Sequence, residues 1–212
     1  MAMIDDLLKE LCPDGVEWKS FSDCCSYIRG ITYNKSQEST SDDGVKVLRA
    51  NNITLSNNSL NFADVKVVDN SVKIKDSQWL KQGDILICAG SGSKEHIGKV
   101  AFVPNDLHYT FGGFMGVIRS KCFVQQSYLF HLLKSTIFSD YLNASLNSST
   151  INNLSASIMS NFSFPLPPLP IQQHIVEVLD TFTDAISNLE EELALREKQY
   201  EYYREKLLSF GK

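Results

Sequence analysis

Apolar residues recur at helical spacing along the last quarter of the chain. Between residues 171 and 210 they fall mostly three or four positions apart, and neither Gly nor Pro interrupts them. This spacing is typical of one face of an α-helix, and a helix over this span is about 60 Å long. From residue 189 the steps alternate between four and three, as in a coiled coil, with Arg196 as the one charged member. We therefore predict a long helix that meets another helix through the following seam: Leu189, Leu193, Tyr200, Tyr203, Leu207 and Phe210.

The chain before residue 164 is built mainly of short apolar runs. They occupy residues 16–18, 45–48, 65–68, 84–88, 99–103 and 114–118, with turn-forming Asn, Gly, Pro and Asp between them. Such runs predict short strands in a curved, largely antiparallel sheet. Residues 4–11 and 127–142 have helical spacing, whereas residues 143–163 are rich in Ser and Asn and predict loops.

These patterns predict an α+β fold in three parts. Residues 1–163 form a β-rich mixed domain, residues 164–170 (FPLPPLP) a proline hinge, and residues 171–212 the long helix. Proline ends regular structure because it lacks a backbone N–H and has a fixed φ.

Composition and charge narrow the class of protein. The chain is 43% hydrophobic, and no apolar run approaches the ~18 residues that a membrane span needs. Its start is acidic and leads into no signal core, so we predict a soluble cytoplasmic protein. The net charge is −5, but residues 171–212 carry nine acidic and five basic side chains, against sixteen and fifteen in the remainder. The first part is therefore nearly neutral, and its charge neither excludes nor establishes a nucleic-acid partner.

No catalytic or metal-binding pattern is complete. Gly92 and Gly98 enclose five residues where a P-loop has four, and Val100 follows Lys99 where Ser or Thr is needed. A glycine-rich loop can still donate N–H groups to a phosphate backbone, and a plain hairpin is equally expected. The four histidines and five cysteines show no metal-ligand spacing, so we predict reduced thiols and neither metal nor cofactor.

Residues 111–116 (FGGFMG) resemble the glycine-rich loop of adenosylmethionine-dependent methyltransferases. Those enzymes also need an Asn/Asp-Pro-Pro-Tyr/Phe element, and the chain has no Asn-Pro-Pro or Asp-Pro-Pro. We therefore do not expect the chain to be a methyltransferase by itself.

Three segments in collinear order carry a family resemblance. They are residues 11–18 (LCPDGVEW), residues 79–88 (WLKQGDILIC) with the glycine-rich stretch to residue 102, and residues 158–182, which include FPLPPLPIQQ at 164–173. Together they resemble the specificity subunit of type I restriction–modification systems. The proline segment with its two glutamines is the most specific piece.

The resemblance implies a half-subunit. A full specificity subunit has two target-recognition domains and two long helices, which lie antiparallel as a coiled coil, whereas this chain has one of each. Two identical copies would then pair as a homodimer and read an inverted repeat, because two-fold protein symmetry imposes two-fold symmetry on the site. A shortened gene or a fragment of a longer chain would give the same sequence.

The implied function is reading DNA sequence for a modification methyltransferase, and for a restriction subunit where one is present, without catalysis by this chain. Lys94 and Lys99 are the expected phosphate contacts. Asn can bind adenine, Arg can bind guanine and Ser can contact either base, so the candidate base contacts are Arg49, Asn51, Asn52, Ser91, Ser93, Arg119, Ser148 and Ser149. Turn formation explains any single Asn or Ser equally well.

Two other classes of function stay open at this point. One is an adaptor whose long helix and β-rich domain bind only proteins. The other is a nuclease or methyltransferase with an unfamiliar site, which would modify or cleave DNA alone.

Overall fold

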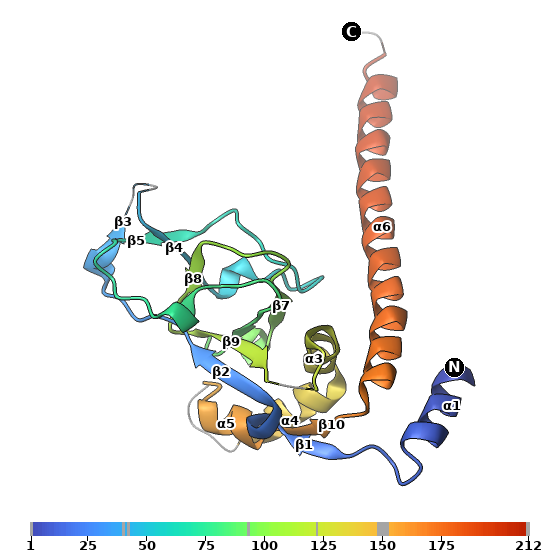
Figure 1. The fold of residues 1–212 in the computed structure, drawn as a ribbon. Helices are drawn as coiled ribbons and strands as arrows, with labels where there is room; N and C mark the ends of the chain where they lie inside the picture. Colours follow the sequence, from blue (N-terminus) through green and yellow to red (C-terminus); the bar gives the residue numbers. More distant parts are fainter. Residues whose placement is uncertain are drawn as a thin grey trace. The chain divides into compact units, whose positions relative to one another are not determined.

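The computed structural model describes residues 2–39, 41, 43–92, 94–121, 123–147 and 153–210. The chain separates into two compact units, Met1–Gln173 and His174–Lys212 (Figure 1). The helices are α1 (Ala2–Leu11), α2 (Phe21–Cys24), α3 (Gln126–Leu133), α4 (Thr136–Asn147), α5 (Ala156–Asn161) and α6 (Leu169–Leu208). The strands are β1 (Trp18–Ser20), β2 (Cys25–Arg29), β3 (Glu38–Ser39), β4 (Val45–Leu48), β5 (Lys66–Val68), β6 (Ile85–Cys88), β7 (Val100–Phe102), β8 (Tyr109–Phe111), β9 (Met115–Ser120) and β10 (Ser163–Pro165).

Two four-stranded sheets and a two-stranded one build the first unit. Their strand orders are β2-β9-β6-β7, β3-β5-β4-β8 and β1-β10. Every pair is antiparallel except β4 with β8, which run parallel with Leu48 opposite Phe111. The prediction of an α+β fold with largely antiparallel strands is confirmed, but the strands form separate sheets and not one curved sheet.

The core lies against strand β6. All four of its residues, from Ile85 to Cys88, are completely buried, because β9 and β7 flank the strand and side chains pack on both of its faces. A strand buried on both faces has a continuous apolar run, and this explains the unbroken ILIC of the sequence. Residues from both four-stranded sheets, including Leu48, Phe111 and Val117, pack into the same cluster.

The helical spacing of residues 127–142 corresponds to two helices and not to one. Helix α3 ends at Leu133 and α4 begins at Thr136. The Ser135 backbone N–H and hydroxyl both donate to the Leu132 carbonyl, at 3.0 and 2.7 Å, so the helix ends in a tighter turn with bonds three residues back. The loop predicted for residues 143–163 also contains helix α5, whose N-cap is Ser155.

The proline segment is anchored and not a free hinge. Phe164 is completely buried in strand β10, opposite Lys19 of β1, and the Tyr128 hydroxyl donates to the Pro165 carbonyl at 2.7 Å. Helix α6 then begins at Leu169, inside the predicted hinge. The first compact unit therefore extends to Gln173, beyond the predicted boundary at residue 163.

Burial explains the first of the two glutamines after the prolines. Gln172 is 0% exposed, and its amide nitrogen donates to the Phe123 and Pro167 carbonyls at 2.8 and 2.7 Å. Its amide oxygen accepts the Gln125 backbone N–H at 2.8 Å. Each polar atom of this buried amide is thus satisfied, which fixes the first turn of α6 to the chain before α3.

The second unit is the remainder of helix α6, which has 40 residues in all. Its apolar side chains are exposed over most of its length, as Phe182 at 63% and Leu189 at 65% illustrate. The helix ends at Leu208, so Phe210 of the predicted seam lies in a turn, with a left-handed φ of 47°. Among the described residues, no helix is both long enough and apolar enough to span a membrane.

Candidate nucleic-acid interface

A cleft in the first unit lies where several strands end. It has a volume of about 780 Å³ and is bordered by residues that directly follow β2, β4 and β6 and by the turn between β8 and β9. The lining residues are Arg29, Ile31, Thr32, Tyr33, Lys35, Glu38, Arg49, Ala50, Asn51, Gly90, Ser91, Gly112, Gly113, Phe114 and Met115. Cationic, amide and aromatic groups therefore converge on a floor of apolar side chains and glycine backbone.

The walls of the cleft depend on a close backbone approach. The Gly30 N–H donates to the Met115 carbonyl at 3.1 Å, and a Cβ added to Gly30 would lie 2.1 Å from the Gly112 carbonyl oxygen. Only glycine fits there. In the same β8–β9 turn, Phe114 is 72% exposed. The segment that resembled a methyltransferase loop is thus one wall of this cleft.

Arg29 holds the wall and does not offer a free guanidinium. Its Nη2 donates to the Gly113 carbonyl at 2.8 Å, and its Nη1 donates to Asn153 Oδ1 and the Leu154 carbonyl, both at 3.1 Å. Tyr27 lies beside it, and burial raises the pKa of this phenol. These contacts attach the chain before α5 to the β8–β9 turn.

The lining of the cleft carries more positive than negative charge. Arg29, Lys35 and Arg49 are its cations, and Glu38 is its one acid among the lining residues. Lys66 Nζ donates to Glu38 at 2.7 Å, and this hydrogen bond lowers the pKa of the carboxyl group. The negative charge of Glu38 is thus offset by a partner on strand β5, which leaves a surface suited to an anionic ligand.

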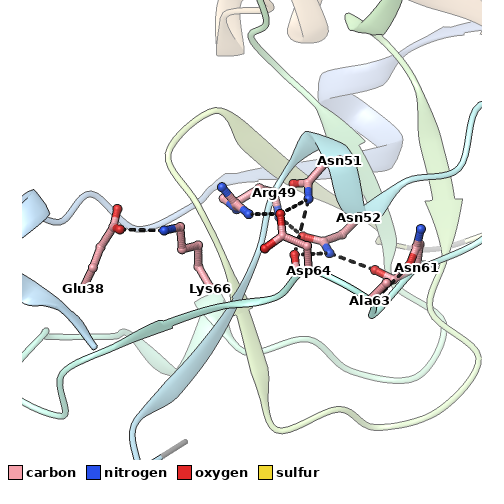
Figure 2. A network of polar contacts seen from close by, with 8 residues as sticks. All are labelled: Glu38, Arg49, Asn51, Asn52, Asn61, Ala63, Asp64 and Lys66. Atoms are coloured by element: carbon pink, nitrogen blue, oxygen red, sulfur yellow. Dashed lines mark hydrogen bonds and ion pairs between the residues drawn. The ribbon is translucent and has the colours of Figure 1, made fainter. Parts of the chain in front are cut away.

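Arg49 and Asn51 converge on one carboxylate. Arg49 Nη2 donates to Asp64 Oδ2 at 2.8 Å, and Asn51 Nδ2 donates to the same oxygen at 2.9 Å (Figure 2). Arg49 follows β4, and Asn51 lies in the 3₁₀ turn η2 (Ala50–Asn52). The structure therefore brings together two of the sequence candidates, and it adds Asp64, which no sequence pattern indicated.

Asn52 does not face the cleft. The residue is 1% exposed, its Oδ1 accepts the Arg49 backbone N–H at 2.8 Å, and its Nδ2 donates to the Asn61 and Asp64 carbonyls at 2.8 and 2.9 Å. All of its polar atoms are used inside the domain (Figure 2). Our assignment of Asn52 as a base contact is therefore replaced by a role in holding Arg49 and Asp64 in place.

Arg119 is likewise held inside the domain. It bonds both oxygens of Asp84, with Nε to Oδ1 at 2.6 Å and Nη2 to Oδ2 at 2.7 Å, and Asp84 is 3% exposed. The guanidinium also donates to the carbonyls of Ser77 and Trp79 at 3.0 and 2.9 Å. We therefore withdraw Arg119 as a guanine contact.

Lys99 points into the structure. Its ammonium donates to the Ile53 carbonyl at 3.1 Å and lies 3.2 Å from His96 Nδ1, and burial lowers its pKa. This geometry favours attachment of the loop before β7 over contact with a phosphate. Lys94 begins the 3₁₀ turn η4 (Lys94–His96), but its side chain lies outside the described part of the chain.

Of the four serine candidates, the structure places one at the cleft. Ser91 lines the cleft beside Gly90, in the segment that follows β6. Ser93, Ser148 and Ser149 lie outside the described residues. Three lining residues that were not among the predicted DNA contacts, Tyr33, Lys35 and Phe114, join Arg49, Asn51 and Ser91 at the cleft. Within the described ranges, no group of three His, Cys, Asp or Glu residues is placed to bind a metal.

Comparisons with known proteins match this architecture. Residues 13–196 match the family described as the type I restriction modification DNA specificity domain. The chain is 32% identical over 171 residues to the StySPI specificity subunit of Salmonella potsdam and to the EcoKI specificity subunit of Escherichia coli K12. Each alignment covers 80% of this chain and 36% of the relative.

Solved structures show the same fold. The HsdS subunit from Thermoanaerobacter tengcongensis superposes with a TM-score of 0.61 at 18% identity, over 90% of this chain and 44% of that one. A chain from a study of the assembly of a type I R-M system gives a TM-score of 0.64, over 93% of this chain and 47% of that one. The chain thus spans between about a third and a half of these relatives. The match over residues 13–196 confirms the resemblance seen in the sequence, and the chain belongs to the type I restriction–modification DNA specificity family.

Proposed function

We propose that the first unit binds double-stranded DNA and reads one half of a bipartite site. The chain would direct a modification methyltransferase to that site in the cytoplasm, together with a restriction subunit where one is present, and would not catalyse the reaction itself. The family match over residues 13–196 carries this proposal. The StySPI and EcoKI relatives are both named as specificity subunits of type I restriction enzymes.

The cleft supplies groups of the kind that DNA reading requires. Arg49, Asn51 and Ser91 can form hydrogen bonds with base edges, and Lys35 is an exposed cation at the border. Base contacts carry sequence information, whereas contacts to phosphates position the protein. We therefore assign base reading to the first three residues and phosphate binding to Lys35.

The long helix is proposed to pair with a second copy. Leu189, Leu193 and Leu207 are each at least 60% exposed on one stripe, and a stripe of this length is unfavourable in water unless it is covered. An antiparallel pair would separate two reading units by the length of the rod. Tyr200 and Tyr203 interrupt the aliphatic stripe, and we propose that this end faces the modification subunit.

Mapping of methylated positions tests the reading function. We expect the native host genome to carry a bipartite methylated motif that disappears when the gene is deleted and returns when the gene is restored. A methylation pattern that is unchanged by the deletion would contradict the proposal.

Light scattering tests the pairing. The full chain should behave as a dimer at micromolar concentration, about twice its 23.8 kDa mass. Changing both Leu189 and Leu193 to Asp should give a monomer, because charges would be buried in an apolar seam. Asp at Ser187 and Ala194, on the other side of the same helix, is the matched control. A wild-type monomer, or equal effects of the two double variants, would contradict pairing through this seam.

A further inference from the structure

We propose that Asp64 holds Arg49 and Asn51 as one donor–acceptor unit that reads a single G·C base pair in the major groove. This inference rests on the proposed DNA-reading function and identifies the base pair that one part of the cleft recognises. It is carried by the hydrogen bonds of the three side chains and by their exposure.

Arg49 is partly fixed and partly available. One N–H of Nη2 is directed to Asp64 at 2.8 Å, and the side chain is 33% exposed at the cleft. Nε is buried and has no hydrogen-bond partner among the described residues, so it cannot serve a ligand from solvent. The second N–H of Nη2 and the two of Nη1 are then the donors left for a ligand, and the proposal uses one from each nitrogen as an adjacent pair.

Asn51 can only accept. Its amide lies 2.9 Å from Asp64 Oδ2 and 3.3 Å from the Asp64 carbonyl. A carboxylate and a carbonyl are acceptors, so the NH₂ group of the amide must face them. The remaining oxygen, Oδ1, is then the group that Asn51 offers to a ligand. This geometry excludes the pairing with adenine that was expected from the sequence, which uses both ends of the amide.

The backbone segments that carry Arg49 and Asp64 are fixed to each other by Asn52. Asn52 accepts from the Arg49 backbone N–H and donates to the Asp64 carbonyl, at 2.8 and 2.9 Å. The two chain segments that carry the unit are thus joined by one buried side chain (Figure 2). Asp64 itself is 71% exposed, so its carboxylate orients the two side chains without being part of the core.

The order of these groups selects the base pair. Across the major groove, a G·C pair presents the N7 and O6 acceptors of guanine and then the N4 amino donor of cytosine. Two adjacent donors from Arg49 followed by the acceptor of Asn51 complement this row. An A·T pair places a donor between its two acceptors, so the fork of Arg49 would meet a donor there.

Arg49→Lys is the most informative variant, because lysine keeps the charge but loses the planar fork. The full chain is incubated with a randomised double-stranded DNA pool, and the enriched sequences are read for wild type, Arg49→Lys, Asn51→Ala and Asp64→Ala. We expect the wild-type motif to contain a required G·C pair. Arg49→Lys and Asp64→Ala should lower the preference for that pair by about 5- to 150-fold while the other positions keep theirs.

Asp43→Ala is the control, because it removes one exposed acidic side chain of the same unit away from the cleft lining. It should leave the motif unchanged. If Arg49→Lys keeps the full motif, or if every position weakens equally, Arg49 contacts phosphate or supports the fold, and the inference is wrong. If wild type enriches no sequence at all, the proposed function fails with it, so the two failures are distinguishable.

Discussion

Two arginine–aspartate pairs in the first unit have similar distances and opposite surroundings. Arg119 and Asp84 meet at 2.6 Å, and Arg49 and Asp64 meet at 2.8 Å. The Asp84 side chain is 4% exposed and the Asp64 side chain is 71% exposed. Arg119 also donates to two backbone carbonyls, whereas Arg49 keeps donors directed at the cleft. The two pairs consist of the same residue types. Burial therefore decides which pair supports the fold and which can contact a ligand.

Removal of the buried carboxylate should have the largest effect. Asp84→Ala leaves the Arg119 guanidinium partly buried without its ionic partner, and such a change costs about 3–5 kcal/mol of unfolding free energy. Urea unfolding of the full chain measures it. Asp64→Ala is the matched control and should change the free energy by no more than about 0.5 kcal/mol. Equal losses from the two variants would show that the pairs do not differ as described.

Two neighbouring asparagines should differ in how much each contributes to the free energy of unfolding. Asn52→Ala leaves the Arg49 N–H and two carbonyls without their partner, and we expect a loss of about 1–3 kcal/mol in unfolding free energy. Asn51→Ala, one position away, should stay within about 0.5 kcal/mol, because its amide lies at the exposed border. The same urea measurements apply. An Asn51 variant as unstable as the Asn52 variant would make Asn51 part of the scaffold.

Tyr128 is a further buried polar side chain, and its partner lies in the proline segment. Tyr128→Phe should cost about 1 kcal/mol, because the hydrogen bond to the Pro165 carbonyl is lost. Burial raises the pKa of Tyr128 to about 12 from the ordinary value of 10.0. The unfolded chain therefore ionises first, and stability that is full below about pH 10 should be lost as the pH rises through about 12.

The Tyr128→Phe variant checks this assignment. Its unfolding free energy, measured from pH 8 upward in the same buffers, should fall less steeply than that of wild type over the alkaline range. Parallel curves for the two proteins would show that another group causes the alkaline loss.

The smallest expected effect concerns two lysines. The logarithm of the binding constant falls as the logarithm of the salt concentration rises. Lys35→Ala should make this slope less negative by about 0.9, because the variant loses one phosphate contact. Lys99→Ala should leave this slope unchanged, since its ammonium is bonded to the Ile53 carbonyl. Fluorescence titration with one duplex at several salt concentrations gives both slopes. The reverse result would restore Lys99 as the phosphate contact.

The periodic parts of the fold could be predicted from the sequence. Helical spacing located α6, and the bounds of β4 were predicted to the residue, because one face of each element is apolar. Strand β2 (CSYIR) was missed, since its polar and apolar residues do not alternate cleanly. Strands β3, β8 and β10 were also missed: β3 is the polar pair Glu38–Ser39, β8 (YTF) runs directly into the glycine segment, and β10 ends at Pro165 in the predicted hinge.

The site could be predicted only by residue type. Asn51 and Asn52 are the same residue side by side, and nothing local shows that one is buried and the other lines the cleft. Their roles are set by Asp64, which a loop brings to both of them. Arg49 and Arg119 likewise differ through partners that are distant along the chain, so contacts formed on folding decide which arginine is left available for the proposed base contacts.

The central claim is that the chain reads DNA sequence. The ratio of its affinities for a target duplex and a non-target duplex tests this claim most directly. The duplex enriched from the randomised pool and a scrambled duplex of the same length and composition are compared by competition at one fixed salt concentration. Sequence reading predicts that the enriched duplex binds on the order of 10³-fold or more tightly. Equal affinity for the two duplexes would contradict the account.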